Sequence, residues 1–218
     1  MSVVSTAGPS SAERAAERSP VVSRSRERQI ELTKTVISAA RRLIEAQGDR
    51  FTIQELVKEA GIALQTFYRL FASKDELLLA VLDDMITEAC AHLEAAAREL
   101  PDPVARVRFY VTQVVQLVDR DATNFGAQFS TAQHWRLYQL FPDGMSQANR
   151  HFADLVARQL EAAHADGLLP ETDPQRDAWF VTQLVMAVYH HAAFADSDRG
   201  LATRSEDLWQ FCRRALGA

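Results

Sequence analysis

The sequence predicts an all-α protein, and three observations support this fold class. Only eight glycines and seven prolines interrupt the 218 residues, so few positions break a helix. From Arg24 onward the residue pattern is helical almost without interruption. No segment alternates apolar and polar residues over the length of a strand. We therefore expect helices alone, in a chain long enough to bury the core of one or two domains.

Helix starts follow from capping chemistry, in which a Ser, Thr or Asp oxygen accepts a free backbone N–H of the first turn. Three capping boxes are present, at Thr52 with Glu55, Ser73 with Glu76, and Thr203 with Glu206. Two further starts place Asp directly before proline, at Asp102-Pro103 and Asp173-Pro174. Gly48 and Gly167 are expected to end helices, because glycine adopts the left-handed cap without strain.

These signals predict a long first helix at about residues 26–47 and two short helices at 52–60 and 64–71. Five or six longer helices follow, one of them at about 75–99 and the last at about 203–216. Residues 1–23 are rich in Ser, Ala and Pro, so we expect them to form a disordered arm. The predicted division is an arm at 1–23, a first domain at 24–74 and a second domain at 75–218.

Charge is distributed unevenly along the chain. The whole sequence has 24 basic and 29 acidic residues, a net charge of −5, which would argue against a nucleic-acid partner if it were spread evenly. Residues 24–74 carry ten basic and six acidic side chains, a net of +4. Residues 75–218 carry 12 basic and 21 acidic side chains, a net of −9. A mildly basic block therefore adjoins a strongly acidic remainder.

Other features exclude whole classes of protein. The two cysteines, Cys90 and Cys212, lack C-x-x-C spacing and are too few to staple a fold of this size, which suits buried thiols in a reducing compartment. No apolar run approaches the roughly 20 residues that span a bilayer, and the N-terminus has no signal-peptide core. We therefore expect a cytoplasmic protein without a membrane partner.

No constellation of catalytic residues is recognisable in the sequence. It has no G-x-S-x-G elbow, no glycine-rich phosphate loop and no H-E-x-x-H pair. His190 and His191 are adjacent on a predicted helix, about 100° apart, so they would not face one metal together. We expect no enzyme activity, no metal and no cofactor.

Residues 52–71, TIQELVKEAGIALQTFYRLF, have the size and punctuation of a helix-turn-helix. The turn is expected at Gly61, with apolar side chains inward on both helices: Ile53, Leu56, Val57 and Ala60 on the first, and Ile62, Phe67 and Phe71 beneath the second. Gln65, Thr66, Tyr68 and Arg69 then point outward. Gln pairs with adenine, Arg pairs with guanine, and Thr or Tyr binds phosphate, so this face suits the major groove of DNA.

Together with the flanking ISAARRLIEAQG and ASKDELLLAVL, this segment resembles the N-terminal domain of the TetR family of bacterial transcriptional regulators, from about residue 26 to 82. The most specific part is the T-F-Y-x-x-F-x-S-K-x-E-L-L string from Thr66 to Leu78. The resemblance implies that the second helix reads operator bases and that the acidic C-terminal domain dimerises and binds an inducer. By position, it implies base contacts from Gln54, Leu64, Gln65 and Arg69, and backbone contacts from Thr52, Thr66, Tyr68 and Lys74.

Two positions depart from the family pattern. Ala63 stands where Ser is common, which removes a capping hydroxyl worth ~1 kcal/mol unless Thr66 or Gln65 replaces it. Leu70 stands where Tyr or His is frequent, so one phosphate contact is in doubt. Alternatives stay open for other residues. The alternative for Tyr68 is a packed aromatic side chain, and for Gln65 and Arg69 it is a merely solvated one. The alternatives for Arg24, Arg26 and Arg28 are a charged, frayed helix start and an arm that reaches DNA, whereas Thr52 is a helix cap in either case.

The acidic remainder is expected to hold the sensor and the dimer interface. The helix at 75–99 begins beside the recognition helix and ends in the second domain, so we expect it to act as a lever. The segment 178–194 is apolar on more than one face, which calls for burial on all sides. The resemblance suggests that this helix and the last one form the interface of a homodimer, which would match a palindromic operator.

Aromatic residues and a few polar groups predict an apolar ligand cavity in the second domain. The candidate contacts are Phe109, Phe125, Phe129, His134, Trp135, Tyr138, Trp179, Gln183, Met186, Tyr189 and His190. The alternative for each is a plain core residue, since aromatics at helical spacing are more often core than ligand contacts. The combined hypothesis is a repressor released from DNA by a small, largely apolar or aromatic ligand. The alternative is a helix-turn-helix protein without ligand sensing that coats DNA and recruits protein partners.

Overall fold

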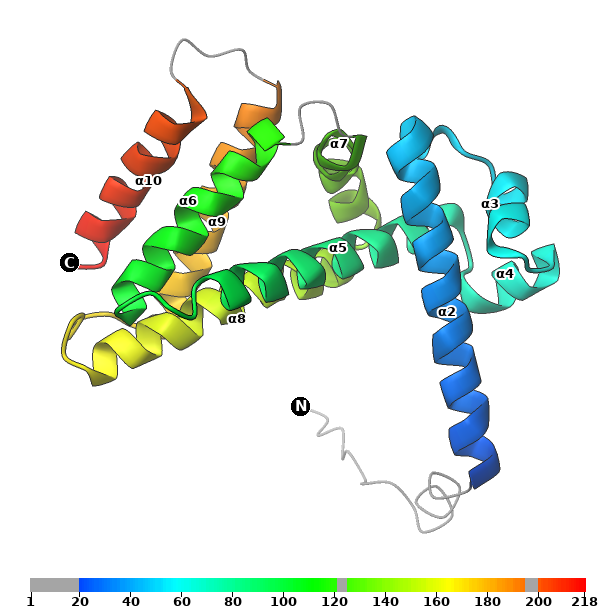
Figure 1. Cartoon of the computed structure of the whole chain (residues 1–218), viewed down its shortest axis with the longest axis horizontal. Helices are drawn as coiled ribbons and strands as arrows, with labels where there is room; N and C mark the ends of the chain where they lie inside the picture. Colours follow the sequence, from blue (N-terminus) through cyan, green and yellow to red (C-terminus); the bar gives the residue numbers. More distant parts are fainter. Residues whose placement is uncertain (1–19, 121–124, 195–199) are drawn as a thin grey trace, which may run out of the picture.

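The computed structural model describes residues 20–120, 125–194 and 200–218, and these residues form helices connected by turns, without any strand (Figure 1). The fold is therefore all-α, as predicted. In chain order the elements are α2 (Pro20–Gln47), the 3-10 turn η1 (Gly48–Arg50), α3 (Ile53–Ala60), α4 (Leu64–Leu70), α5 (Lys74–Ala96), α6 (Pro103–Arg120), α7 (Phe125–Leu140), α8 (Pro142–Ala165), α9 (Pro174–Phe194) and α10 (Leu201–Ala215).

The N-terminal part is built on α2, which crosses the N-terminal end of α5 and carries α3 and α4 on one side (Figure 1). Its core contains Val36, Ile44, Leu56, Phe67 and Leu78, all essentially buried. Burying apolar side chains from four helices in one cluster is what holds these short helices together, since helices of seven or eight residues are unstable alone.

The C-terminal part packs α6, α8, α9 and α10 around a second core, into which α5 inserts Leu93. α5 therefore belongs to both cores, because its first turns bury Leu77 and Leu82 in the N-terminal cluster. α7 and the start of α8 also contribute to the N-terminal cluster, through Leu137 and Met145. Apolar packing thus crosses the predicted division at residue 74 and makes α5 and α7 common to both parts.

Most predicted helix ends are confirmed. Thr52 and Ser73 accept the backbone N–H groups of Glu55 and Glu76 at the starts of α3 and α5. Asp102 Oδ1 accepts the Ala105 N–H at 2.7 Å, and Asp173 Oδ1 accepts the Arg176 N–H at 3.2 Å. Gly48 and Gly167 have φ values of +67° and +71°, the left-handed conformation that was expected of them.

Two helix starts differ from the predictions. α2 begins at Pro20, so residues 20–23 are helical and do not belong to a disordered arm; residues 1–19 of that arm lie outside the described residues. Proline is tolerated in a first turn, and Ser23 Oγ donates to Glu27 Oε1 at 3.0 Å. The capping box at Thr203 is wrong: α10 starts after Gly200, and the Glu206 carboxylate accepts from Arg108 and Gln210 instead.

None of the helices in the described part of the chain has the length and apolar character needed to span a bilayer.

Candidate nucleic-acid interface and ligand cavity

The first helix of the helix-turn-helix, α3, is held by a complete capping box. The Thr52 hydroxyl accepts the Glu55 N–H at 3.2 Å and donates to Glu55 Oε2 at 2.9 Å, while the Thr52 N–H donates to the same carboxylate oxygen at 2.6 Å. These hydrogen bonds lower the pKa of Glu55 and keep the carboxylate charged. The Thr52 hydroxyl is thus engaged within the cap, which supports a structural role for this predicted phosphate contact.

The turn between α3 and α4 depends on Gly61. Its backbone lies at φ +65° and ψ +33°, and the following N–H of Ile62 donates to the Val57 carbonyl at 3.0 Å. A Cβ here would meet no atom within 4 Å, so the requirement for glycine is conformational and not steric crowding. The turn sets the angle between the two helices, as the sequence predicted.

The second helix, α4, separates a buried side from an exposed side. Phe67 is completely buried and Phe71 nearly so, whereas Tyr68 is 53% exposed. Leu64, Gln65 and Arg69 are exposed beside Tyr68, and Thr66 is half-buried; on α3, Gln54 is exposed as well. Tyr68 is therefore not a core aromatic, and α4 presents one apolar, two polar and one cationic side chain to the outside.

No side chain among the described residues caps the N-terminus of α4, where Ala63 occupies the capping position. Replacing Ala63 by Ser is expected to raise the free energy of unfolding by ~1 kcal/mol, because the hydroxyl would accept a free N–H of the first turn. Urea denaturation would measure the change. Ala46→Ser, at an exposed position inside α2, is the matched control and should give no gain. An Ala63→Ser protein no more stable than the parent would contradict the prediction.

Lys74 was predicted as a phosphate contact, but its side chain does not lie free beside the exposed side of α4. Its ammonium group donates to the carbonyl oxygens of Asp49 and, at 2.7 Å, Phe51, and it lies 4.3 Å from the centre of the Phe51 ring. Partial burial lowers the pKa of Lys74. The side chain thus ties the start of α5 to the segment that leads into α3, and we interpret it as a positioning residue.

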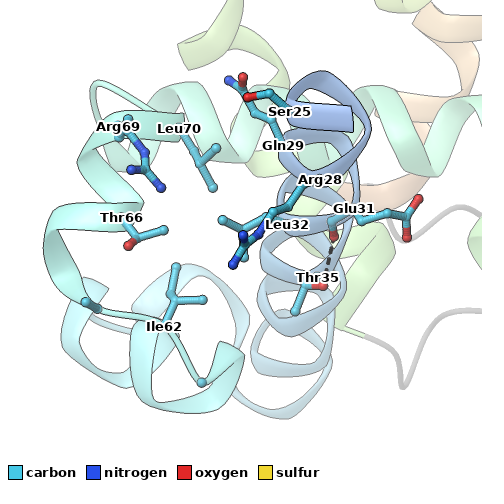
Figure 2. A pocket seen from close by; sticks show the side chains of 12 residues that line it. Ser25, Arg28, Gln29, Glu31, Leu32, Thr35, Ile62, Thr66, Arg69 and Leu70 are labelled. Carbon is cyan, nitrogen blue, oxygen red and sulfur yellow. Dashed lines mark hydrogen bonds between the residues drawn. The ribbon is translucent and has the colours of Figure 1, made fainter. Parts of the chain in front are cut away.

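A groove of about 920 Å³ runs between the N-terminal half of α2 and the helix-turn-helix. Figure 2 shows Arg28 of α2 and Arg69 of α4 on opposite walls of this groove, with Thr66 and Leu70 on the α4 wall and Ile62 near the turn. Arg24 and Arg26 are also exposed on the same helix. The groove therefore carries guanidinium groups from two helices beside the exposed face of α4, an arrangement that suits a phosphate backbone.

A second, smaller cavity of about 160 Å³ lies in the C-terminal part. It is lined by Leu82, Met85, Ile86, Ala89, Cys90 and Leu93 of α5, Val114 and Leu117 of α6, His134 of α7, Asn149 and Phe152 of α8, and Met186, Tyr189 and His190 of α9. Four of the predicted ligand contacts, His134, Met186, Tyr189 and His190, meet here. They come from helices far apart in the sequence, so only the folded chain brings them together.

Two buried histidines form the polar part of this cavity. The ring centres of His134 and His190 lie 4.0 Å apart. Burial lowers the pKa of His134, and burial together with the charge of His134 lowers the pKa of His190 to about 4. Both rings are therefore neutral near pH 7. Within the described residues, neither ring nitrogen of His190 has a hydrogen-bond partner.

Six predicted ligand contacts do not line the cavity. Phe129 belongs to the N-terminal core, and the Tyr138 hydroxyl accepts from Asn149 Nδ2 at 3.2 Å. Phe109 lines a different pocket, together with Thr112 and Gln116. Trp135, Trp179 and Gln183 are exposed. These assignments are corrected because aromatic content does not show which face of a helix turns inward; the side chain of Phe125 lies outside the described residues.

The α5 wall of the cavity was not predicted from the sequence. Met85, Ile86 and Ala89 of α5 are half-buried and line the cavity. A usable signal was their apolar character on a helix that was expected to connect the two domains. Asn149 and Phe152 of α8 were not predicted as ligand contacts.

α7 connects the cavity to the support of the helix-turn-helix. His134 lines the cavity, while the preceding Gln133 donates from Nε2 to Asp49 Oδ2 at 2.6 Å. Arg136, two residues later, pairs with Asp75 Oδ1 at 2.7 Å. Asp49 and Asp75 flank the Lys74 contacts described above. A shift of α7 would therefore move the residues that hold the start of α5 and the entry to α3.

Three large apolar side chains on α9 and α10 are uncovered in the single chain. Trp179 and Phe180 of α9 are 53% and 52% exposed, with ring centres 5.0 Å apart, and Phe211 of α10 is 52% exposed. Among the α9 side chains whose burial is described, one stripe is buried, including Val181 and Val185. Burial of α9 on all sides, as predicted from its composition, would need a partner surface over these aromatics.

No three His, Cys, Asp or Glu side chains converge into a possible metal site among the residues that the structure describes.

Comparisons with known proteins agree with this architecture. The family model described as bacterial regulatory proteins, tetR family, matches residues 36–81. The HTH-type transcriptional regulator EthR of Mycolicibacterium smegmatis is 26% identical over 173 residues, covering 77% of this chain and 76% of that protein. The HTH-type transcriptional regulator HbdR of Aromatoleum sp. is 25% identical over 165 residues, covering 74% of this chain and 70% of that protein.

Solved structures share the fold. RolR, determined in complex with resorcinol, superposes with a TM-score of 0.65 at 19% identity, covering 88% of this chain and 90% of that chain. The transcriptional regulator FadR of Bacillus subtilis, determined with stearoyl-CoA, superposes with a TM-score of 0.61 at 16% identity, covering 82% of this chain and 96% of that chain. At these identities the likeness shows a common helical fold.

Proposed function

We propose, from the premise that this chain belongs to the TetR family of DNA-binding transcriptional regulators, that it is a repressor released from its operator by a small ligand. One observation carries the proposal: α5 begins beneath α4 and continues to form a wall of the cavity. A helix that contributes to both sites transmits a displacement from one to the other, provided that the ligand binds the two positions of the helix unequally.

In the proposed complex, α4 enters the major groove of the operator. Gln65 and Arg69 reach base edges, since Gln pairs with adenine and Arg with guanine, and Leu64 and Gln54 lie beside them. Tyr68 and Thr66 bind phosphates, and Arg28 adds a further phosphate contact from the opposite wall of the groove in Figure 2. Thr52 and Lys74 act indirectly, by holding α3 and the start of α5 in place.

The proposed regulator is a homodimer that joins two copies through α9 and α10. Three exposed aromatic side chains on these helices support this interface, because an uncovered apolar patch of that kind is typical of a partner surface. Two-fold symmetry would set two α4 helices against the half-sites of a palindromic operator. The −9 charge of residues 75–218 would repel phosphate and leave the helix-turn-helix side as the one that approaches DNA.

Genomic selection tests the proposed function. The full chain is incubated with fragmented genomic DNA, bound fragments are sequenced, and the recovered site is titrated in a gel shift with and without a small-molecule extract of the source cells. We expect a few palindromic sites and at least a tenfold loss of affinity with extract. Binding at many unrelated sites, unaffected by any extract, would instead support a DNA-coating protein.

The contacts of α7 predict a variant that binds ligand but does not respond to it. Gln133→Ala combined with Arg136→Ala removes the links to Asp49 and Asp75. We expect unchanged operator affinity without extract, and a response to extract that is reduced by about two- to thirtyfold, since residues on a coupling route contribute 0.5–2 kcal/mol. Fluorescence anisotropy with a labelled operator measures both quantities.

Gln139→Ala is the matched control for this variant, because Gln139 is an exposed glutamine on the same helix. It should respond to extract like the parent protein. A full response from the double variant would show that coupling does not pass through α7.

A further inference from the structure

The size of the cavity on α5, α7 and α9 limits the ligand. Its volume is about 160 Å³. A dry protein cavity of ~150 Å³ lined by Leu, Ile and Phe binds benzene. The cavity is therefore matched in size to one six-membered ring.

The walls favour an apolar ring. Met85, Ile86 and Leu93 of α5 line the cavity together with Phe152 of α8 and Met186 of α9. Methionine sulfur and aromatic edges make favourable contacts with a ring, and flexible methionines adapt to its outline. Apolar walls on several helices would bury most of the surface of such a ring.

His190 supplies a specific polar contact. The side chain is only 9% exposed, and in the described residues both ring nitrogens lack a partner. A buried polar group is favoured when it has a hydrogen-bond partner, so a ligand that bonds to His190 is favoured over one that cannot. A hydroxyl group suits either tautomer of a neutral imidazole, because it both donates and accepts.

Charge is disfavoured in the cavity. None of its lining residues, all of which are described, is Asp, Glu, Lys or Arg. The titratable groups that face it are Cys90, His134, Tyr189 and His190. Burial raises the pKa of the Cys90 thiol to about 11 and keeps it protonated. An ionised ligand would lose its hydration and find no opposite charge, which costs several kcal/mol.

Resting on the proposed function, we propose that the ligand is a neutral, single-ring phenol whose hydroxyl group hydrogen-bonds His190. The ring lies between the apolar residues of α5 and α8, and His134 borders the same space beside His190, with the two ring centres 4.0 Å apart. Tyr189 and Asn149 border the same space.

Isothermal titration calorimetry of the full chain tests this ligand class with four probes: phenol, benzene, benzoate and 2-naphthol. We expect phenol to bind about tenfold more tightly than benzene, since one hydrogen bond contributes 0.5–1.5 kcal/mol. Benzoate should bind at least tenfold more weakly than phenol because of its charge, and 2-naphthol at least tenfold more weakly because of its second ring.

His190→Leu removes the hydrogen bond and leaves an apolar wall. Its affinities for phenol and benzene are expected to become equal within about twofold. His191→Leu is the matched control, because His191 is the next residue on α9 and is exposed. It should keep the tenfold preference for phenol.

Equal affinities for phenol and benzene in the parent protein would overturn the proposal, as would tighter binding of benzoate or 2-naphthol. A preference for phenol that survives His190→Leu would overturn the role of His190. If that variant does not fold, the comparison of phenol with benzene in the parent protein decides. If extract releases the protein from its operator but phenol does not bind, only the ligand class is refuted. If phenol binds but neither phenol nor extract releases the protein from its operator, the proposed function is refuted.

Discussion

Replacing Arg69 by Ala is expected to weaken operator binding by at least about thirtyfold and to relax its sequence preference. Arg69 is exposed on α4 and lines the groove shared with α2. A bidentate contact to guanine contributes ~1–3 kcal/mol, and a dimer makes that contact twice. The proposed contact thus accounts for about 2 kcal/mol or more of the binding free energy.

Tyr68→Ala is expected to act differently, although the two residues are neighbours. A lost phosphate hydrogen bond costs ~1 kcal/mol in each half-site, so the affinity should fall about thirtyfold for all sequences alike. Tyr68 is 53% exposed, and its ring meets the edge of the Phe67 ring with 5.2 Å between ring centres. The melting temperature of the variant should therefore stay close to that of the parent protein.

Fluorescence anisotropy against the selected operator and against a scrambled duplex measures both variants at one fixed salt concentration. Arg98→Ala is the matched control for charge, because Arg98 is an exposed arginine beyond the end of α5. It should leave the affinity within about twofold of the parent. Unchanged operator binding by both Arg69→Ala and Tyr68→Ala would remove α4 from the DNA interface.

Replacing Trp179 by Asp is expected to convert the protein from a dimer to a monomer. An aromatic anchor at the centre of an interface contributes ~2 kcal/mol or more, and a two-fold interface contains it twice. The dimer dissociation constant should therefore rise by about a thousandfold or more, which sedimentation velocity measures directly. Operator affinity should fall with it, since a monomer occupies one half-site.

Trp135→Asp is a strict control for this change. Trp135 is 66% exposed, more than Trp179, but it lies on α7 and not on α9 or α10. Its replacement should leave the dimer intact if α9 and α10 form the interface. A dimeric Trp179→Asp protein, or a monomeric Trp135→Asp protein, would place the interface elsewhere.

The inside and the outside of the helix-turn-helix could be predicted from the sequence. Leu56 and Phe67 are buried, and Gln65, Tyr68 and Arg69 are exposed, as expected. These faces follow from helical periodicity over a few residues, and the turn follows from one glycine. Tertiary packing adds little to that assignment, because rotation of either helix about its axis would expose its apolar side.

The ligand cavity could be predicted only in part. His134, Met186, Tyr189 and His190 were identified because they are polar or large residues in a predicted core. Trp135 and Trp179 were assigned wrongly to the cavity for the same reason. Composition reports that a helix carries aromatics, but the angle at which helices cross decides which of them meet.

Local chemistry alone determined the helical class, most helix ends and the exposed face of α4, because capping and periodicity act within about one turn of a helix. Only the tertiary structure decided that Lys74 holds two backbone carbonyls and that α5 and α7 serve both cores. It alone placed His134 against His190, 4.0 Å apart. Those arrangements depend on contacts between residues distant in sequence, which form once apolar burial has brought the helices together.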